Sequence, residues 1–448
     1  MDDKTVKGIV DRWMIPTPAG AYMAGIENRP VIERAQGIYV FDTAGKRYFD
    51  FGSGQMAAAL GHNHPRYVAA VKRNLETISH STKTFLNVDR LELHRRLGEI
   101  LTPPLQKSLF LVSGSDAVEA AVDMARKATG GFDVLALSMA LHGSTSFITR
   151  SLTFGWNRRK HGLAAPGTSA ILTPYEYRSP VGLTDDFVGQ CLRTSFEIAD
   201  ANFSAQPAAV IIEPVLSAGG IIVPPPGYMK ELQKMCRDRG MLLIMDESQT
   251  GLGKTGRMWG HQHDGAVPDI MTVSKHFGAG LPVSAVCTST DIAERAVGNG
   301  YVATRSHACD PITCAAGVAS IDIVQEEGLV ERAAEIDLRM RRLLEDMAKE
   351  IELIGDIRGR GVLYGVELVL DRETREPADA IARTVVQKCQ DAGLLLQARG
   401  SHGRTNIVRL VPPMVSTDAE VDEGLSILRD ALLSVSRSAK ERRQQTAA

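Results

Sequence analysis

The chain of 448 residues lacks several features that mark whole classes of protein. Its six cysteines form no C-x-x-C pair and have no matching histidine pair, so the sequence indicates neither a zinc site nor a disulfide framework. No stretch approaches the roughly 18 apolar residues of a membrane span, and the N-terminus has no apolar signal core. We therefore expect a cytoplasmic protein that has no membrane partner.

The sequence also lacks an excess of charge of either sign. Its 51 Lys and Arg residues nearly balance 53 Asp and Glu residues, which gives a formal net charge of −2. Proteins that bind nucleic acid through a broad electrostatic field carry a basic excess, so we expect no nucleic-acid partner. The composition is that of a globular protein, and the expected partner is a small molecule.

Apolar runs that alternate with helical patterns fill the middle of the chain. The runs typical of buried strands lie at 108–112, 133–137, 208–212, 241–245 and 269–273. Continuous apolar runs between helices are typical of parallel strands that are covered on both faces. The sequence therefore predicts an α/β fold built on a mainly parallel sheet.

Different patterns flank this central region. Short strand patterns separated by turn residues predict a small antiparallel sheet near the N-terminus, and long charged helices alternate with short strands beyond about residue 325. We predict an N-terminal segment, 1–60, that packs with the small domain, a large domain, 61–325, and a small α+β domain, 326–448. Residues from Arg437 onward are polar, and we expect them to fray.

Polar residues follow three of the predicted strands, where ligands bind in open parallel sheets. Gly114 and Ser115 open a helix, whose free N–H groups suit a phosphate. Asp246 offers a carboxylate that would pair with a protonated ring nitrogen. Lys275 lies between an apolar strand and a glycine-rich loop, where burial lowers the pKa of an amine and favours formation of a Schiff base.

Each of these three features, taken alone, has a commoner explanation as a helix cap, a turn residue or a surface lysine. Their conjunction is far more specific. An anion cradle, a carboxylate and a buried amine at one sheet edge match the phosphate, the ring nitrogen and the aldehyde of pyridoxal phosphate.

The chain resembles the class III aminotransferases of the fold type I pyridoxal-phosphate family over nearly its whole length. The resemblance is carried by IMDESQTGLGKTG at 244–256, by the tripeptide 268–270 and by Ser274-Lys275. It implies a large domain with a mainly parallel seven-stranded sheet covered by helices and a smaller α+β domain. It also implies the cofactor pyridoxal 5'-phosphate, an amino donor, a 2-oxo acid acceptor, and a homodimer or a tetramer of dimers.

The resemblance assigns roles to matching positions. Lys275 forms the covalent link to the cofactor and moves the proton, Asp246 pairs with the ring nitrogen, and Gln249 lies near the phenolic oxygen. Ser306 stands where the family usually has Thr and would reach the phosphate bound by the neighbouring subunit. The implied cofactor-binding residues are Gly114, Ser115, His142, Ser217, Asp246, Gln249, Lys275 and Ser306.

Within the family the chain most resembles 2,2-dialkylglycine decarboxylase, through FGSGQM at 51–56, EPVLSAGGII at 213–222 and Arg409. This resemblance implies decarboxylation-dependent transamination with an acceptor such as pyruvate. Gln55 would hold the breaking carboxylate perpendicular to the ring, and Arg409 would pair with a carboxylate in the plane. A buried amide that satisfies backbone groups is an equal alternative for Gln55.

Two positions depart from the decarboxylase pattern. Leu141 replaces the aromatic residue that stacks on the cofactor, which favours the alternative of an amine or ω-amino-acid transaminase without decarboxylation. A lyase or epimerase on the same fold is a further alternative. Lys83 replaces a small hydroxyl residue near an alkali-cation site, although Asp310 is retained, and we assign no metal. A non-catalytic scaffold that kept the fold is disfavoured, because Lys275, Asp246 and Gln249 are all retained. Dinucleotide binding is rejected, because no G-x-G-x-x-G motif follows the first strand.

Overall fold

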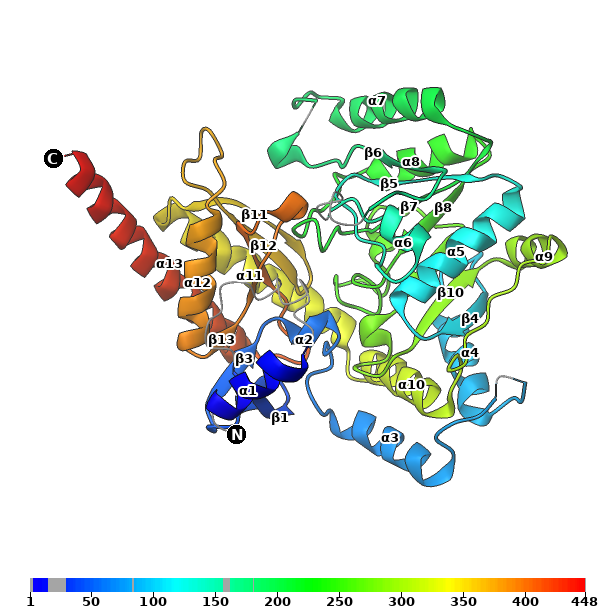
Figure 1. The fold of residues 1–448 in the computed structure, drawn as a ribbon, viewed down its shortest axis with the longest axis horizontal. Coiled ribbons are helices and arrows are strands. Elements are labelled where there is room, and N and C mark those ends of the chain that lie inside the picture. The colour runs from blue at the N-terminus through cyan, green and yellow to red at the C-terminus, as the bar shows by residue number, and fades with distance from the viewer. Residues whose placement is uncertain (1–2, 15–29, 83, 156–161, 180, 448) are drawn as a thin grey trace.

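The computed structural model describes all residues except 1–2, 15–29, 83, 156–161, 180 and 448. Two lobes lie side by side (Figure 1). One lobe is built on a seven-stranded sheet, and the other contains two four-stranded sheets. No helix in the described part of the chain has the length and apolar character needed to cross a membrane.

The large sheet has the strand order β4-β10-β9-β8-β7-β5-β6. Its strands are β4 (Lys107–Leu111), β5 (Asp133–Leu137), β6 (Thr168–Ile171), β7 (Pro207–Ile212), β8 (Leu242–Asp246), β9 (Ile270–Val273) and β10 (Ser284–Thr288). Every neighbouring pair is parallel except the two that β10 makes with β4 and β9. The predicted mainly parallel seven-stranded sheet is confirmed.

Helices cover both faces of this sheet. Along β5, Val134 and Ala136 pack into a core shared with α5 (Gly114–Thr129) and α9 (Thr290–Gly298). The alternate residues Leu135 and Leu137 pack on the opposite side. The helices of that side are α7 (Phe187–Asn202) and α8 (Tyr228–Arg237). Burial on both faces explains the continuous apolar runs in the sequence.

The second lobe combines both ends of the chain. One of its sheets consists of β1 (Ile32–Gln36), β2 (Tyr39–Asp42), β3 (Arg47–Asp50) and β13 (Leu394–Leu395), and the other of β11 (Ile354–Arg360), β12 (Leu363–Leu368), β15 (Ile407–Leu410) and β14 (Gln397–Ala398). The first three strands form the predicted small antiparallel sheet. Phe49 and Phe51 share one apolar core with Leu363 and Leu425, so the N-terminal segment packs against the C-terminal part.

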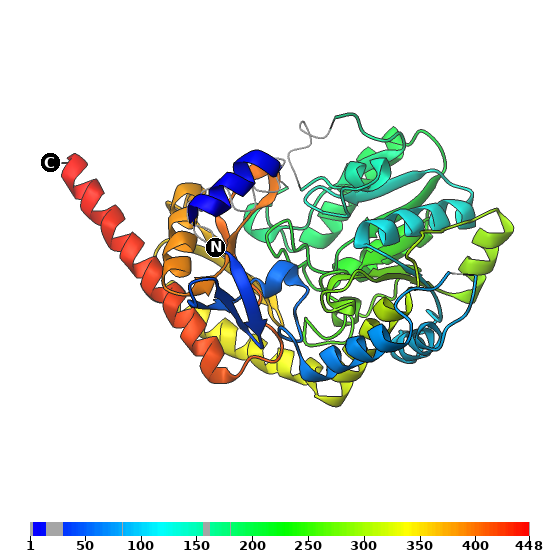
Figure 2. The ribbon, with the colours of Figure 1, turned by 60° about the horizontal axis from the view of Figure 1, so that its bottom comes forward.

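The remaining helices connect and cover these sheets. They are α1 (Asp3–Trp13), α2 (Ser53–Met56), α3 (Pro65–Thr77), α4 (Val88–Ile100), α6 (Phe147–Ser151), α10 (Pro311–Glu326), α11 (Leu329–Glu350), α12 (Asp379–Asp391) and α13 (Asp418–Ala447). Both views show α13 projecting away from the second lobe (Figure 2). It continues past Arg437, where we expected fraying, because the segment has no Gly or Pro there and is rich in helix-forming residues.

Candidate active site

The carboxyl ends of β4, β8 and β9 lie at one edge of the large sheet, because β4 and β9 both run antiparallel to β10. They border a cavity of about 460 Å³. The opposite wall comes from α2 and from the sheet that contains β15. The structure brings nine predicted site residues to this cavity: Gln55, Gly114, Ser115, His142, Ser217, Asp246, Gln249, Lys275 and Arg409.

Ser306 is the predicted site residue that does not line the cavity. It is exposed in the loop between α9 and α10. Its expected contact is with a phosphate in a neighbouring subunit, so this role stays a prediction. Lys83 lies outside the described residues.

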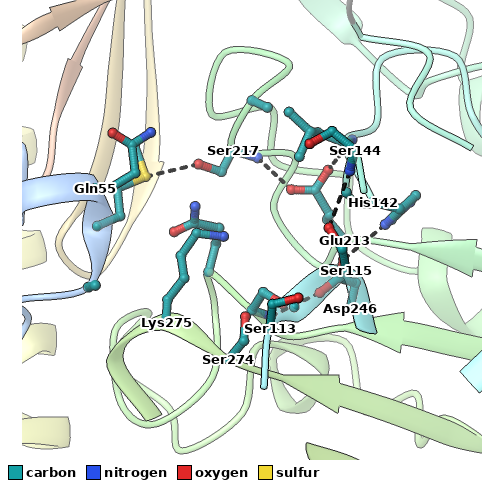
Figure 3. Close-up of a pocket in the computed structure, with 18 of the residues that line it drawn as sticks. Gln55, Ser113, Ser115, His142, Ser144, Glu213, Ser217, Asp246, Ser274 and Lys275 are labelled. Carbon is teal, nitrogen blue, oxygen red and sulfur yellow. Dashed lines mark hydrogen bonds and ion pairs between the residues drawn. The ribbon is translucent and has the colours of Figure 1, made fainter. Parts of the chain in front are cut away.

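Lys275 follows β9 directly, and its side chain points into the middle of the cavity (Figure 3). Its backbone φ is 54°, a left-handed conformation that costs a non-glycine residue on the order of 1 kcal/mol. Burial lowers the pKa of the Lys275 amine, although the carboxylates of Asp246 and Glu213 oppose that shift. Backbone strain and a lowered amine pKa at one side chain are typical of a catalytic group.

Asp246 ends β8 and is buried. Its Oδ2 lies 3.0 Å from Nδ1 of His142, and its Oδ1 accepts hydrogen bonds from the Ser248 N–H and the Thr272 hydroxyl, both at 3.1 Å. Burial by itself raises the pKa of Asp246, but His142 and Ser248 outweigh it and the pKa lies below its ordinary value. The carboxylate is therefore held in its charged form, ready for a cationic partner.

Glu213 follows β7 and is a second buried carboxyl group at the same sheet edge. Its two oxygens accept hydrogen bonds from the backbone N–H groups of Leu141, at 2.9 Å, and Ser217, at 3.2 Å. Burial raises the pKa of Glu213 to about 7. The pKa values of two neighbouring carboxyl groups are thus shifted in opposite directions, that of Asp246 downward and that of Glu213 upward.

The start of α5 is crowded against the loops after β5 and β9. A Cβ added at Gly114 would lie 2.7 Å from Oγ of Ser274, and one added at Gly143 would lie 2.3 Å from Oγ of Ser115. Ser113 caps the helix in a reciprocal pair with Asp116, and Ser113, Gly114 and Ser115 line the cavity. This arrangement of small residues at a helix start suits a phosphate.

A chain of polar groups crosses the opposite wall. Arg409 of β15 donates from Nη2 to Oε1 of Gln397, which pairs with it across the two strands. Nε2 of Gln397 in turn donates to Oε1 of Gln55 at 3.4 Å. Arg399 also lines this wall. The wall opposite Asp246 therefore carries guanidinium and amide groups, which are suitable partners for the carboxylate of a substrate.

Gln249 is held by a lysine inside the signature stretch. Lys254 is fully buried, and its Nζ donates to the backbone oxygen of Met56 at 3.0 Å and to Oε1 of Gln249 at 3.4 Å. Burial places the pKa of Lys254 well below its ordinary value. This lysine links the loop after β8 to α2, and so it positions two walls of the cavity relative to each other.

Glu213 and Arg399, which line the cavity, and Gln397, which pairs with Arg409, had no predicted role. Glu213 follows a predicted strand exactly as Asp246 does, so the strand-end rule could have identified it. Gln397 and Arg399 belong to or follow β14, which has only two residues and no strand pattern in the sequence. Their position becomes visible only when β14 pairs with β15.

Comparison with known proteins gives a family match over most of the chain. The profile of the family Aminotransferase class-III matches residues 22–432. The probable 4-aminobutyrate aminotransferase of Bacillus subtilis is 35% identical over 90% of this chain and 93% of its own length. The 5-aminovalerate aminotransferase DavT of Pseudomonas aeruginosa is 33% identical over 95% of this chain and 98% of its own.

The fold has a solved counterpart of similar extent. An amine transaminase from an uncultivated Pseudomonas species, determined in its PLP-bound form, superimposes with a TM-score of 0.85. It is 29% identical, and the match covers 91% of this chain and 96% of that chain.

Proposed function

Because the chain belongs to the class III aminotransferase family, we propose that it transfers the amino group of an amine or an ω-amino acid to a 2-oxo acid. It is an enzyme of the α/β fold type I, and its cofactor is pyridoxal 5'-phosphate. The observation that carries the proposal is the Lys275 amine, which enters a cavity that also holds Asp246 and the start of α5.

The residues present fit this cofactor. Gly114 and Gly143 let the backbone at the start of α5 pack closely against Ser274 and Ser115, and small residues of this kind at a helix start suit a phosphate. Asp246 is held as an anion, as the protonated ring nitrogen requires. His142 lines the cavity, and its buried Nε2 has no hydrogen-bond partner among the residues that the structure describes.

When bound, the cofactor ring supplies a sink for the electron pair that is released at the amine-bearing carbon of the donor. In our proposal the N–H groups of Gly114 and Ser115 bind the phosphate, and Asp246 holds the ring nitrogen protonated. Nζ of Lys275 removes the proton from the amine-bearing carbon. Its lowered pKa favours the unprotonated amine that this step needs.

Arg409 orients the acceptor in this proposal, since its guanidinium forms two parallel hydrogen bonds with a carboxylate. An amine donor brings no carboxylate to this position. The Gln397 amide then remains the partner of Arg409, as it is in the structure. The same cavity can therefore bind the 2-oxo acid acceptor and an amine donor without a carboxylate, and the Arg409 guanidinium has a partner in both cases.

The names of the relatives support the donor class. Two of them are named for 4-aminobutyrate and 5-aminovalerate, whose amino groups are remote from the carboxylate, and the structural counterpart is named an amine transaminase. Leu141 supports the same class, since it removes an aromatic wall and widens the cavity for the donor.

Decarboxylation-dependent transamination is the second candidate, and Gln55 favours it. The Gln55 side chain lines the cavity, and Gln397 connects it to Arg409. Gln55 and Arg409 would bind a carboxylate on the amine-bearing carbon of the donor. If so, Gln55→Ala lowers CO2 release from 2-aminoisobutyrate more than transamination of L-alanine, and equal losses would remove that role.

The deciding assay follows alanine and CO2 with pyruvate as acceptor and three donors: 5-aminovalerate, α-methylbenzylamine and 2-aminoisobutyrate. Alanine from the first two donors without CO2 supports the proposal. Carbon dioxide from the third donor, with little turnover of the others, would replace it by the decarboxylase reaction.

Arg409→Gln should raise KM for pyruvate, and the exposed control Arg429→Gln should not.

We also propose that two chains associate. Phe85, Leu86 and Val88 are exposed by 67%, 68% and 81%, so three large apolar side chains are exposed within four residues of sequence, as is typical of protein contacts. Light scattering measures the mass of the assembly and distinguishes a dimer from a tetramer. A monomer at micromolar concentration would overturn this proposal.

A further inference from the structure

Two histidines and an aspartate that are far apart in the sequence meet beside α10. His80 comes from the loop before α4, His307 from the loop after α9, and Asp310 is the residue that precedes α10. Within the described residues, this is the one group of three His, Cys, Asp or Glu side chains whose ligand atoms all lie within 4.8 Å of one another. The group does not line the cavity of the candidate active site.

The carboxylate of Asp310 stands between the two imidazoles. Its Oδ1 lies 2.7 Å from Nδ1 of His80, and its Oδ2 lies 2.8 Å from Nδ1 of His307. The two rings are 5.3 Å apart between centroids. Both ring nitrogens therefore face one buried carboxylate from two sides.

Both carboxylate oxygens of Asp310 are available to these histidines, because the side chain does not cap α10. An aspartate at the start of a helix normally accepts a hydrogen bond from a backbone N–H of the first turn through its side chain. Here the Asp310 side chain makes no such bond, although its backbone oxygen accepts from Thr313 and Cys314. The backbone is thus fixed while both carboxylate oxygens remain directed at His80 and His307.

We propose that His80, His307 and Asp310 bind one divalent transition-metal ion of the Zn²⁺ type. Two imidazole nitrogens and one carboxylate oxygen are the ligand set of open zinc sites, whose fourth position is taken by water. Metal–ligand bonds of about 2.0–2.1 Å place tetrahedral ligands about 3.3 Å apart, so each imidazole moves outward by roughly half an ångström.

Within the single chain the side chains of His80 and His307 are 58% and 69% exposed, while that of Asp310 is 9% exposed, so the packing of this chain leaves the histidines room to move. The ligand set also selects the metal. Alkali and alkaline-earth ions prefer sites made only of oxygen, whereas imidazole nitrogen favours zinc, cobalt and nickel. The site is therefore different in kind from an alkali-cation site at Asp310.

The test is calorimetric titration of the chelator-treated holoenzyme with ZnCl2, supported by the visible absorbance of Co²⁺ in the same site. We expect one Zn²⁺ per chain. His80→Ala and His307→Ala should each weaken binding by about tenfold or more, and the double variant should lose this site. The matched control is His402→Asn, because His402 is an exposed histidine outside the group.

Asp310→Asn is the third variant, since it removes the charge and keeps the shape. If it does not fold, the two exposed histidines decide the matter alone. Zinc binding by the wild type no stronger than by the double variant would overturn the proposal and leave the three residues as a link between loops. Displacement of Zn²⁺ by K⁺ or Mg²⁺ at equal concentration would also overturn it, since that marks an oxygen site.

Discussion

At the scale of single residues, Lys275 combines a strained backbone, a lowered amine pKa and a position in the middle of the cavity. Lys275→Ala should therefore reduce turnover of 5-aminovalerate with pyruvate by more than about 1,000-fold, since no other amine takes its place. The size of the assembly should not change. The control Lys388→Ala removes an exposed lysine of α12 and should leave the rate unchanged, whereas wild-type turnover by Lys275→Ala would refute the assignment.

Glu213 predicts a pH dependence of stability. Burial raises its pKa to about 7 in the folded protein, from about 4.5 in the unfolded chain. The folded state then holds more protons between these values, so this group's stabilising contribution is complete below pH 4.5 and falls as pH rises to 7. The loss is about 3 kcal/mol.

Glu213→Gln removes this titration. The difference in unfolding free energy between wild type and variant, measured by urea unfolding of the cofactor-free protein, should shift in favour of the variant from pH 5 to pH 8. A difference that does not vary with pH would show that Glu213 is ionised throughout.

Part of the candidate site could be predicted from the sequence, because some of its residues follow predicted strands. Asp246 and Lys275 follow apolar runs in the sequence, and the parallel arrangement brings such positions to one edge. Gln55 and Arg409 were assigned through resemblance, and the structure places both at the cavity. Gln397 carries no sequence signal, since its importance lies in a cross-strand contact with Arg409.

At the scale of elements, the start of α5 depends on small residues. Gly143 has a φ of 112°, and a Cβ there would lie 2.3 Å from Oγ of Ser115. Gly143→Ala should cost about 1 to 3 kcal/mol and weaken retention of the cofactor, because Ser115 must move away from the phosphate position. Dialysis followed by the absorbance of the bound cofactor measures the retention.

The control for this prediction is Gly182→Ala. Gly182 has a positive φ of 77°, but a Cβ added there meets no atom within 4 Å. It shares the backbone strain without the crowding. Equal cofactor loss in both variants would mean that strain alone, and not displacement of Ser115, is responsible.

Elements were predictable where the apolar runs are long. The run at 133–137 coincides with β5, and the run at 208–212 lies within β7. Strands β6 and β10 were not found, because TSAI and SAVCT contain small and hydroxyl residues that do not form a continuous apolar run. Their neighbours in the sheet, not their own composition, make them strands.

At the scale of the whole molecule, Glu367 of β12 joins the two lobes. It accepts hydrogen bonds from Tyr175 and Arg178 of the large-sheet lobe and pairs with Arg358 at 2.9 Å. Arg358 also donates to the backbone oxygen of Gly220 at 2.9 Å. Glu367 is buried, and although burial raises its pKa, Arg358, Tyr175 and Arg178 hold the pKa below its ordinary value.

Glu367→Gln should therefore destabilise the protein by about 1 to 3 kcal/mol, because it removes the charge that pairs with Arg358 and Arg178, although Asp356 still pairs with Arg358 at 2.6 Å. The exposed control Glu373→Gln should change the free energy of unfolding by less than about 0.5 kcal/mol. Urea unfolding of both variants is the measurement. A loss below 1 kcal/mol for Glu367→Gln would show that water replaces the carboxylate.

The separation into a parallel-sheet region and an α+β region was visible in the sequence, since the two have different patterns. How the regions meet was not. The chain positions that face each other across the cavity, such as Gln55 and Asp246, belong to different lobes, and no local pattern encodes the packing that brings them together.

The cavity takes one wall from a residue near the start of the described chain, Gln55, and another from Arg409 of the last strand. A chain still emerging from the ribosome has the sheet edge with Asp246 and Lys275 long before β15 can dock. Until that strand docks, the cavity lacks the wall that carries Arg409. The residues assigned to the cofactor are thus made before the strand that completes the cavity, and the cavity becomes whole only when β15 docks.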